Sequence, residues 1–206
     1  MKNRTALSTA IAAFAAFVVL GALVSFRPPG ALDRWAELFF FGQATQLAAA
    51  LTAAGTFPAY VTLCVAVLLA GYVRREWLPG AALAVGTFVV AWQTSDLFKA
   101  IFHRARPPHS LVYHETSASY PSGHAVLAMT FWGILAYYTV LALPPSRTRS
   151  VFVTAIVLWI LGIGWSRLAL GAHYLSDVAG GYLLGLGFVS IVALVMRLLE
   201  ARGERL

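Results

Sequence analysis

Charged side chains are scarce in this sequence of 206 residues. Asp, Glu, Lys and Arg together make up 11% of it, whereas a typical soluble domain carries about 25%. Hydrophobic residues make up 60%, and the mean hydropathy is +0.76. This shortage of charge excludes an ordinary soluble domain and is typical of a protein embedded in a membrane.

Cysteine and acidic residues are also few. Cys64 is the one cysteine, so an intramolecular disulfide is impossible and a zinc–cysteine cluster is excluded; we expect a small buried hydrophobic residue there. Eight acidic residues against 15 basic ones give a formal net charge of +7. Most cations flank apolar stretches instead of forming one patch, so we do not expect nucleic-acid binding.

Long apolar stretches recur along the chain, and a helix of about 20 such residues crosses a bilayer. The stretch 6–26 is longer than the apolar core of a cleaved signal peptide, which is roughly 7–15 residues, and it reads as a retained first span. The uncharged stretch 38–73 is too long for one crossing, and Gly55 and Pro58 favour a new helix near its middle.

These patterns predict a single all-α integral-membrane domain, 1–206, built as a bundle of six transmembrane helices. Residues 31–54 are expected to form one amphipathic helix at the membrane interface, between spans one and two. Gly181 and Gly185 have the spacing that lets helices pack closely in lipid. The predicted spans are 6–26, 56–73, 78–95, 125–143, 150–165 and 178–196.

The distribution of Lys and Arg predicts the orientation. With the N-terminus inside, nine of the 15 basic residues lie on the inner side. We therefore expect a multi-pass protein of the cell (inner or plasma) membrane with both termini in the cytoplasm. The polar loops then face the outer side, periplasmic or extracellular.

Two polar loops, 99–123 and 166–177, should emerge on the same side, because two predicted spans separate them. All five histidines lie between Lys99 and Asp177. Three cations come together there without a comparable set of acids: Lys99, Arg106 and Arg167. Arginine presents a planar fork that suits phosphate oxygens, and lysine adds a point charge.

The segment before the predicted span 125–143 adds a second anion-binding feature. Ser122 and Gly123 precede a helix expected to start near His124, and a helix N-terminus favours negative charge. His173 and Asp177 are four residues apart, so on a helix they would share one face. The carboxylate would then fix the imidazole tautomer and leave the other ring nitrogen as a nucleophile, while His124 handles the leaving group's proton.

Other readings of these residues remain open. Any one Lys or Arg could be an interfacial anchor, and His103, His109 and His114 are expected to be helix caps or surface residues. Asp96 is expected to pair with Lys99. We expect Tyr120 and Trp165 to belong to the interfacial aromatic belt.

Three motifs occur in order and resemble the signature of the type 2 phosphatidic acid phosphatase superfamily. The motifs are Lys99-x6-Arg106-Pro107, Pro121-Ser122-Gly123-His124 and Ser166-Arg167-x5-His173-x3-Asp177. The resemblance implies a phosphohistidine at His173, orientation of that ring by Asp177 and protonation of the leaving group by His124. It also implies catalysis without a metal or other cofactor, with the phosphoryl oxygens held by Lys99, Arg106, Ser122, Gly123 and Arg167.

The expected function is therefore hydrolysis of a lipid phosphate in the bilayer. Similar bacterial proteins imply undecaprenyl diphosphate, phosphatidylglycerophosphate or phosphatidate as the substrate, and the sequence selects none of them. A lipid phosphotransferase or a non-catalytic membrane interaction protein of the same fold are the alternatives. Six spans argue against a soluble vanadate-dependent haloperoxidase, and polar residues at helix ends argue against a transporter.

Overall fold

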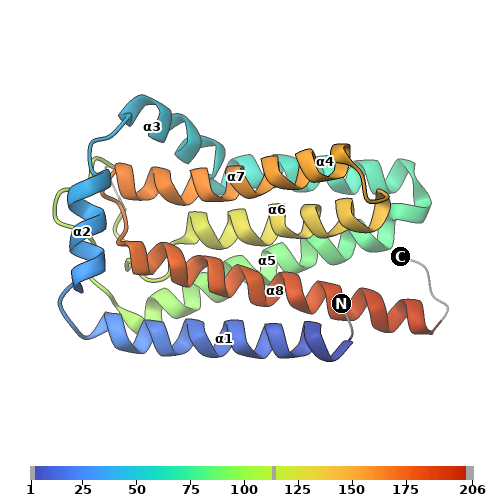
Figure 1. Ribbon diagram of the computed structural model, residues 1–206, viewed down its shortest axis with the longest axis horizontal. Helices are drawn as coiled ribbons and strands as arrows, with labels where there is room; N and C mark the ends of the chain where they lie inside the picture. Colours follow the sequence, from blue (N-terminus) through green and yellow to red (C-terminus); the bar gives the residue numbers. More distant parts are fainter. Residues whose placement is uncertain (1–2, 113–114, 203–206) are drawn as a thin grey trace.

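The computed structural model describes residues 3–112 and 115–202, and within these ranges the regular structure is entirely helical (Figure 1). Five helices are long and apolar enough to cross a membrane, and a sixth candidate span is a pair of helices bent by 45°. The elements, in chain order, are α1 (Asn3–Ser25), α2 (Ala31–Phe40), α3 (Thr45–Ala54), α4 (Phe57–Val73), η1 (Arg75–Trp77), α5 (Leu78–Phe102), α6 (Gly123–Ala142), α7 (Arg147–Ala169) and α8 (Leu175–Ala201).

The segment predicted as one interfacial helix is divided into α2 and α3, so that prediction is wrong in this detail. The backbone between them turns through left-handed conformations at Gly42 (φ 77°) and Ala44 (φ 41°). The Gly42 amide donates to the carbonyl of Ala169 at 2.9 Å, which fixes the turn against the end of α7. α3 and α4 form the bent pair, and their junction carries the expected break, with Gly55 capping α3 and Pro58 in the first turn of α4.

α8 lies in the interior of the bundle between α1 and α6 (Figure 1). Its glycines allow close approach to α6, as predicted. A Cβ atom at Gly181 would lie 2.7 Å from the backbone oxygen of Ser122, and one at Gly185 would lie 2.7 Å from Cβ of Met129. Cys64 is buried on α4, also as expected.

Tyr120 lies in the core and not in an interfacial belt, which corrects the sequence-based expectation. Its side chain is fully buried, its ring stacks on Phe17 with centroids 5.4 Å apart, and its hydroxyl donates to the carbonyl of Phe17 at 2.6 Å. A Cβ at Gly180 would lie 2.3 Å from this ring, so the glycine makes the space. Tyr120 thereby anchors the polar loop directly before the Pro121-Ser122-Gly123-His124 motif.

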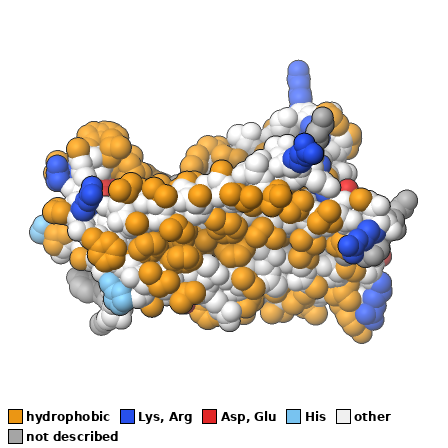
Figure 2. Space-filling model, turned by 90° about the horizontal axis from the view of Figure 1, so that it is seen from below, with side chains coloured by type: hydrophobic (Ala, Val, Ile, Leu, Met, Phe, Trp, Pro, Cys, Tyr) orange, Lys and Arg blue, Asp and Glu red, His pale blue; other side chains and the backbone are white. Residues whose placement is uncertain are grey.

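The outer surface is apolar along the length of the helices. Figure 2 shows hydrophobic side chains over the middle of one face, with Lys and Arg nearer its two ends. Large exposed apolar residues lie on helices such as α1 and α7, including Ile11, Val19, Val151 and Leu158. The start of α1 and the end of α8 lie at one end of the bundle, and the ends of α5 and α7 and the starts of α6 and α8 lie at the other (Figure 1). The predicted polar residues gather at that second end.

Candidate active site

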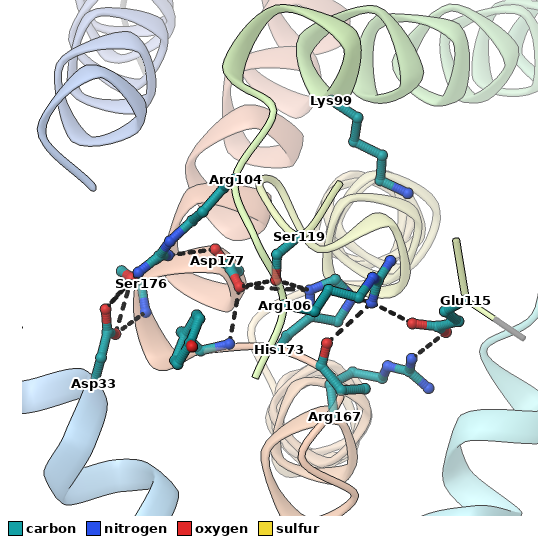
Figure 3. A network of polar contacts seen from close by, with 12 residues as sticks. Asp33, Lys99, Arg104, Arg106, Glu115, Ser119, Arg167, His173, Ser176 and Asp177 are labelled. Atoms are coloured by element: carbon teal, nitrogen blue, oxygen red, sulfur yellow. Dashed lines mark hydrogen bonds and ion pairs between the residues drawn. The ribbon is translucent and has the colours of Figure 1, made fainter. Parts of the chain in front are cut away.

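The two polar loops meet, as predicted, at the end of the bundle away from the start of α1. Nη1 of Arg106, from the α5–α6 loop, lies 3.2 Å from Nε2 of His173 and donates to the carbonyl of Ala172 at 2.9 Å. Lys99 points from the last turn of α5 toward the same place, and Arg167 reaches it from the last turn of α7 (Figure 3).

A pocket of about 190 Å³ lies where these elements converge. Five of the eight predicted site residues line it: Lys99, Arg106, Gly123, His124 and His173. The other three, Ser122, Arg167 and Asp177, are fully buried behind the lining. The structure therefore brings all eight to one region, in two layers.

Several buried polar atoms of this region have no hydrogen-bond partner among the described residues. They are Oγ of Ser122, Nε2 of His124 and Nε of Arg167. Buried polar groups are almost always paired, and leaving one unpaired costs about 1–3 kcal/mol. Three such groups in one site are the mark of a place built to receive hydrogen bonds from, or give them to, a ligand.

Ser122 is the N-cap residue of α6, and Gly123 is its first residue. The Gly123 position faces Lys99, since a Cβ built there would lie 3.5 Å from Nζ. The helix N-terminus and the ammonium group therefore approach each other across the pocket. Both favour an anion between them.

His173 and Asp177 are close, but not for the predicted reason. α8 begins at Leu175, so His173 precedes the helix and the pair does not share a helical face. Nδ1 of His173 lies 3.6 Å from Oδ2 of Asp177, too far for a good hydrogen bond. Oγ of Ser119 lies between them, 3.3 Å from Nδ1, and donates to Oδ2 at 2.5 Å.

These contacts fix the tautomer of His173. Arginine can only donate, so Nε2 of His173 accepts from Arg106 and must carry the lone pair. Nδ1 then carries the hydrogen and donates to Ser119, whose hydroxyl hydrogen goes on to Asp177. Burial, and after it the charges of Arg167 and Arg106, hold the pKa of His173 well below its usual range. The ring is therefore neutral, with an available electron pair at Nε2.

Asp177 is held in turn by Arg104, which sequence reasoning missed. The guanidinium group pairs with Asp177 on one side and with Asp33 of α2, at 2.7 Å, on the other. It also donates to Oγ of Ser176 at 2.7 Å and lies over the ring of Tyr174. Figure 3 shows this chain of contacts running from α2 to α8. Its sequence signal is slight: a second arginine two residues before Arg106, and one acid in the first turn of a short helix.

Glu115 is the second residue that sequence reasoning missed. Its carboxylate forms ion pairs with both Arg106 and Arg167 (Figure 3). Burial raises the pKa of Glu115, but the two guanidinium groups outweigh burial and leave that pKa below its ordinary value. Its signal in the sequence is that it is the one acid in the loop 99–123.

The remaining polar residues behave as expected where the structure describes them. Asp96 lies 3.9 Å from Nζ of Lys99. His103 caps α5 and is exposed, as is His109, while His114 lies outside the described residues. Within the described ranges, no three His, Cys, Asp or Glu side chains group in a way that could hold a metal ion.

A family model described as the PAP2 superfamily matches residues 59–201. The chain belongs to this superfamily. The matched segment begins in α4 and ends with α8, so it contains every residue of the predicted site. Its long apolar helices and the membrane phosphatases that resemble it, given below, show that the chain is a multi-pass membrane protein.

Curated relatives are phosphatases by name. Phosphatidylglycerophosphatase B of Bacillus subtilis is 33% identical over 117 residues, which cover 56% of each chain. Decaprenylphosphoryl-5-phosphoribose phosphatase of Mycobacterium tuberculosis is 33% identical over 123 residues, 58% of this chain and 60% of that one. The chain spans about half the length of the curated relatives it matches.

The fold is also that of a solved structure. A crystal structure of a transmembrane PAP2-type phosphatidylglycerolphosphate phosphatase from Bacillus subtilis matches with a TM-score of 0.79. The match covers 96% of this chain and 98% of that one, at 24% identity. This likeness shows the shared membrane-helix fold.

Proposed function

We propose that this protein hydrolyses the phosphate ester or diphosphate of a lipid held in the membrane. The observation that carries the proposal is the set of unpaired buried groups, Ser122 Oγ, His124 Nε2 and Arg167 Nε, beside a pocket that also holds Lys99 and Arg106. Donors in a fixed array around one small polar space are what a phosphoryl group requires, because phosphoryl transfer depends mainly on positioning and on neutralising charge.

The reaction proceeds in two steps through His173. Nε2 attacks phosphorus, the bond from phosphorus to the lipid or phosphate leaving oxygen breaks, and His124 donates a proton to that oxygen. A water molecule then attacks the phosphohistidine, His124 takes its proton, and inorganic phosphate leaves with Nε2 restored. Ser119 and Asp177 stabilise the positive charge that develops on the His173 ring during attack. None of these steps uses a metal or another cofactor.

The pocket lining supports a lipid as the carrier of the phosphate. Phe57 of α4, Trp92 of α5 and Leu127 of α6 form its apolar part, and Phe57 stacks on Trp92 with centroids 4.1 Å apart. A headgroup in the polar part would therefore leave its chain beside spans that face the bilayer. The names of relatives fit this class: phosphatidylglycerophosphatase B, decaprenylphosphoryl-5-phosphoribose phosphatase and undecaprenyl-diphosphatase. Phosphatidate belongs to the same chemical class.

We infer that the site lies on the outer face of the membrane, with both termini in the cytoplasm. The distribution of Lys and Arg along the sequence supports this orientation, and the start of α1 and the end of α8 lie at the end of the bundle opposite the site. A cysteine introduced at the exposed His109, in a Cys64→Ala background, should react with an impermeant maleimide on intact cells. Labelling only after the cells are opened would contradict this orientation and indicate that the site faces the cytoplasm.

The decisive experiment measures inorganic phosphate released by the purified protein from a panel of lipid phosphates and diphosphates. We expect His173→Ala to lower the rate at least about 1,000-fold, as loss of a nucleophile does, and activity to persist in EDTA. His109→Ala is the matched control, since this exposed histidine lies in the α5–α6 loop and does not line the pocket. Turnover by His173→Ala at the wild-type rate would refute the assignment.

A further inference from the structure

Arg106 covers the atom that the proposed reaction needs. Its Nη1 lies 3.2 Å from Nε2 of His173, and that lone pair is the one required for attack on phosphorus. Nη1 is kept there by Glu115 and by the carbonyl of Ala172. The same guanidinium group donates through Nε to the carbonyl of Ser117 at 2.8 Å.

Glu115 also occupies the phosphate-binding face of both arginines. Its two carboxylate oxygens are divided between them, one on Arg106 and one on Arg167. Arginine recognises carboxylate and phosphate with the same planar fork, so one anion excludes the other from these nitrogens. A phosphoryl group can bind Nη1 of Arg106 and Nη2 of Arg167 only after the Glu115 carboxylate has left them.

We propose that Glu115 is an internal competitor for the phosphate site and thereby a determinant of specificity, which selects phosphates carried on a lipid over small free phosphate anions. The proposal rests on the proposed function. When a substrate displaces Glu115, Arg106 follows the incoming phosphate oxygens and uncovers Nε2 of His173.

Displacing Glu115 costs the same free energy for every phosphate, so the selection is one of occupancy: a phosphate fills the site at a given concentration only if other contacts offset that cost. A lipid phosphate offsets that cost with its chain, which contacts the apolar lining at Phe57, Trp92 and Leu127. Inorganic phosphate and short soluble esters have no chain to place there. The product phosphate is therefore held weakly and leaves readily as the carboxylate returns.

Exposure indicates which partner moves. The Arg167 side chain is 0% exposed and sits at the end of a transmembrane helix, whereas Glu115 is 24% exposed and lies in the α5–α6 loop. The carboxylate can turn toward water, where its charge is solvated, and the arginines stay to bind phosphate. Asp96 lines the same pocket but forms its ion pair with Lys99 and not with either arginine.

The test replaces Glu115 by Gln, which keeps the shape and removes the competing charge. We measure the affinity of orthovanadate and inorganic phosphate by ligand-induced thermal shift and by inhibition, and kcat/KM for p-nitrophenyl phosphate and for a lipid phosphate. Both anions should bind about 10-fold more tightly, the scale of one charge-assisted hydrogen bond. For the soluble ester kcat/KM should rise by a similar factor, whereas kcat for the lipid, measured at saturation, should change by less than about 3-fold, so that free phosphates occupy the site at lower concentrations.

Asp96→Asn is the matched control, because it removes one negative charge from the same pocket and loosens only a long contact to Lys99, at 3.9 Å, without freeing an arginine. An equal gain in Asp96→Asn would mean that Glu115 acts only by through-space repulsion and would overturn the proposal. Weaker phosphate binding in Glu115→Gln would overturn it as well, since Glu115 would then be holding the arginines in place for phosphate. Glu115→Ala, which should change affinity in the same direction as Gln, serves if the Gln variant folds poorly.

The same measurements separate this proposal from the proposed function. Phosphate and vanadate affinity are read without turnover, so the competition is tested even in a protein that hydrolyses none of the lipids. Absence of turnover by the wild type would contradict the proposed function. Normal lipid hydrolysis with no gain in phosphate affinity would contradict the role of Glu115 alone.

Discussion

Replacing Ser119 by Ala tests how Asp177 acts on His173. Among the described residues, the Ser119 hydroxyl is the one group that hydrogen-bonds to both side chains. Its Oγ lies 2.5 Å from Oδ2 of Asp177 and 3.3 Å from Nδ1 of His173. The direct Nδ1–Oδ2 separation is 3.6 Å. Removing the hydroxyl should therefore disconnect the imidazole from the carboxylate that stabilises its positive charge during attack.

The magnitude follows from the contacts that are lost and kept. A hydrogen bond to a charged group is worth about 1.5–3 kcal/mol, and 1.36 kcal/mol is a tenfold change in rate. We expect kcat to fall roughly 10- to 100-fold on this scale. KM should change little, because Ser119 touches none of the proposed phosphate ligands. Asp177 keeps Arg104 and the backbone amide of Tyr174, 2.8 Å from Oδ2, so the fold should survive.

The assay is phosphate release from a lipid phosphate, with kcat and KM determined separately for Ser119→Ala, Asp177→Asn and Ser110→Ala. Ser110 is the control, since it lies in the same loop and its hydroxyl bonds only to the nearby Val112. A kcat for Ser119→Ala within about 3-fold of wild type (less than about 1 kcal/mol), together with a large loss in Asp177→Asn, would refute the bridge. Asp177 would then bond directly to the ring.

Two further predictions concern stability. The pKa of His173 is depressed in the folded protein, whereas histidine in an unfolded chain is protonated near pH 6.5. The contribution of His173 to the free energy of unfolding is therefore complete above that pH. It is lost below that pH, by at most about 1.4 kcal/mol per pH unit. Between about pH 7.5 and about pH 5.5, wild type should therefore lose more Tm than His173→Asn, and equal losses would contradict the shift. Gly181→Ala places a Cβ 2.7 Å from the Ser122 carbonyl oxygen and should cost about 1–3 kcal/mol of stability by overpacking, measured as a lower Tm. Gly86→Ala is the control, because a Cβ there has no neighbour within 4 Å and should not lower Tm. Equal Tm changes in the two variants would contradict the packing argument.

The sequence predicts the parts of the structure that depend on local residue pattern or on the number of membrane crossings. Apolar length locates the membrane helices, because a bilayer requires a minimum apolar run. The meeting of Arg106 and His173 follows from counting: two crossings between two loops return the chain to the same side. The start of α6 at Gly123 agrees with the helix start expected near His124, where the apolar stretch begins.

The parts that the sequence does not predict are contacts between distant residues with no local signature. Asp33 and Ser176 are 143 positions apart, yet they hydrogen-bond at 2.8 Å between side chains. Ser119 becomes important only because the chain before α8 is not helical, so His173 and Asp177 stand too far apart to touch. The sequence does not predict the division of α2 from α3, since residues 38–54 contain no charge and no proline, and only the backbone at Gly42 and Ala44 shows the turn.

The acidic partners of each cation show which arginines support the structure and which are available to a ligand, a distinction that the sequence does not give. A buried charge needs a partner, and an unpaired one is costly. Arg104 has two carboxylates, Asp33 and Asp177, and a serine besides, so its donors are engaged by the protein itself. It is a support for Asp177.

Arg106 and Arg167 stand in a different position, because one carboxylate, Glu115, serves both. Nε of Arg167 has no partner among the described residues, and among the same residues Asp96, at 3.9 Å, is the one acid that pairs with Lys99. These three cations together carry more positive charge than the acids beside them neutralise. A second anion, or a more highly charged one in place of Glu115, would balance them. A phosphoryl group is such an anion, and the shortage of acidic residues in the sequence is, at this end of the bundle, the property that makes room for it.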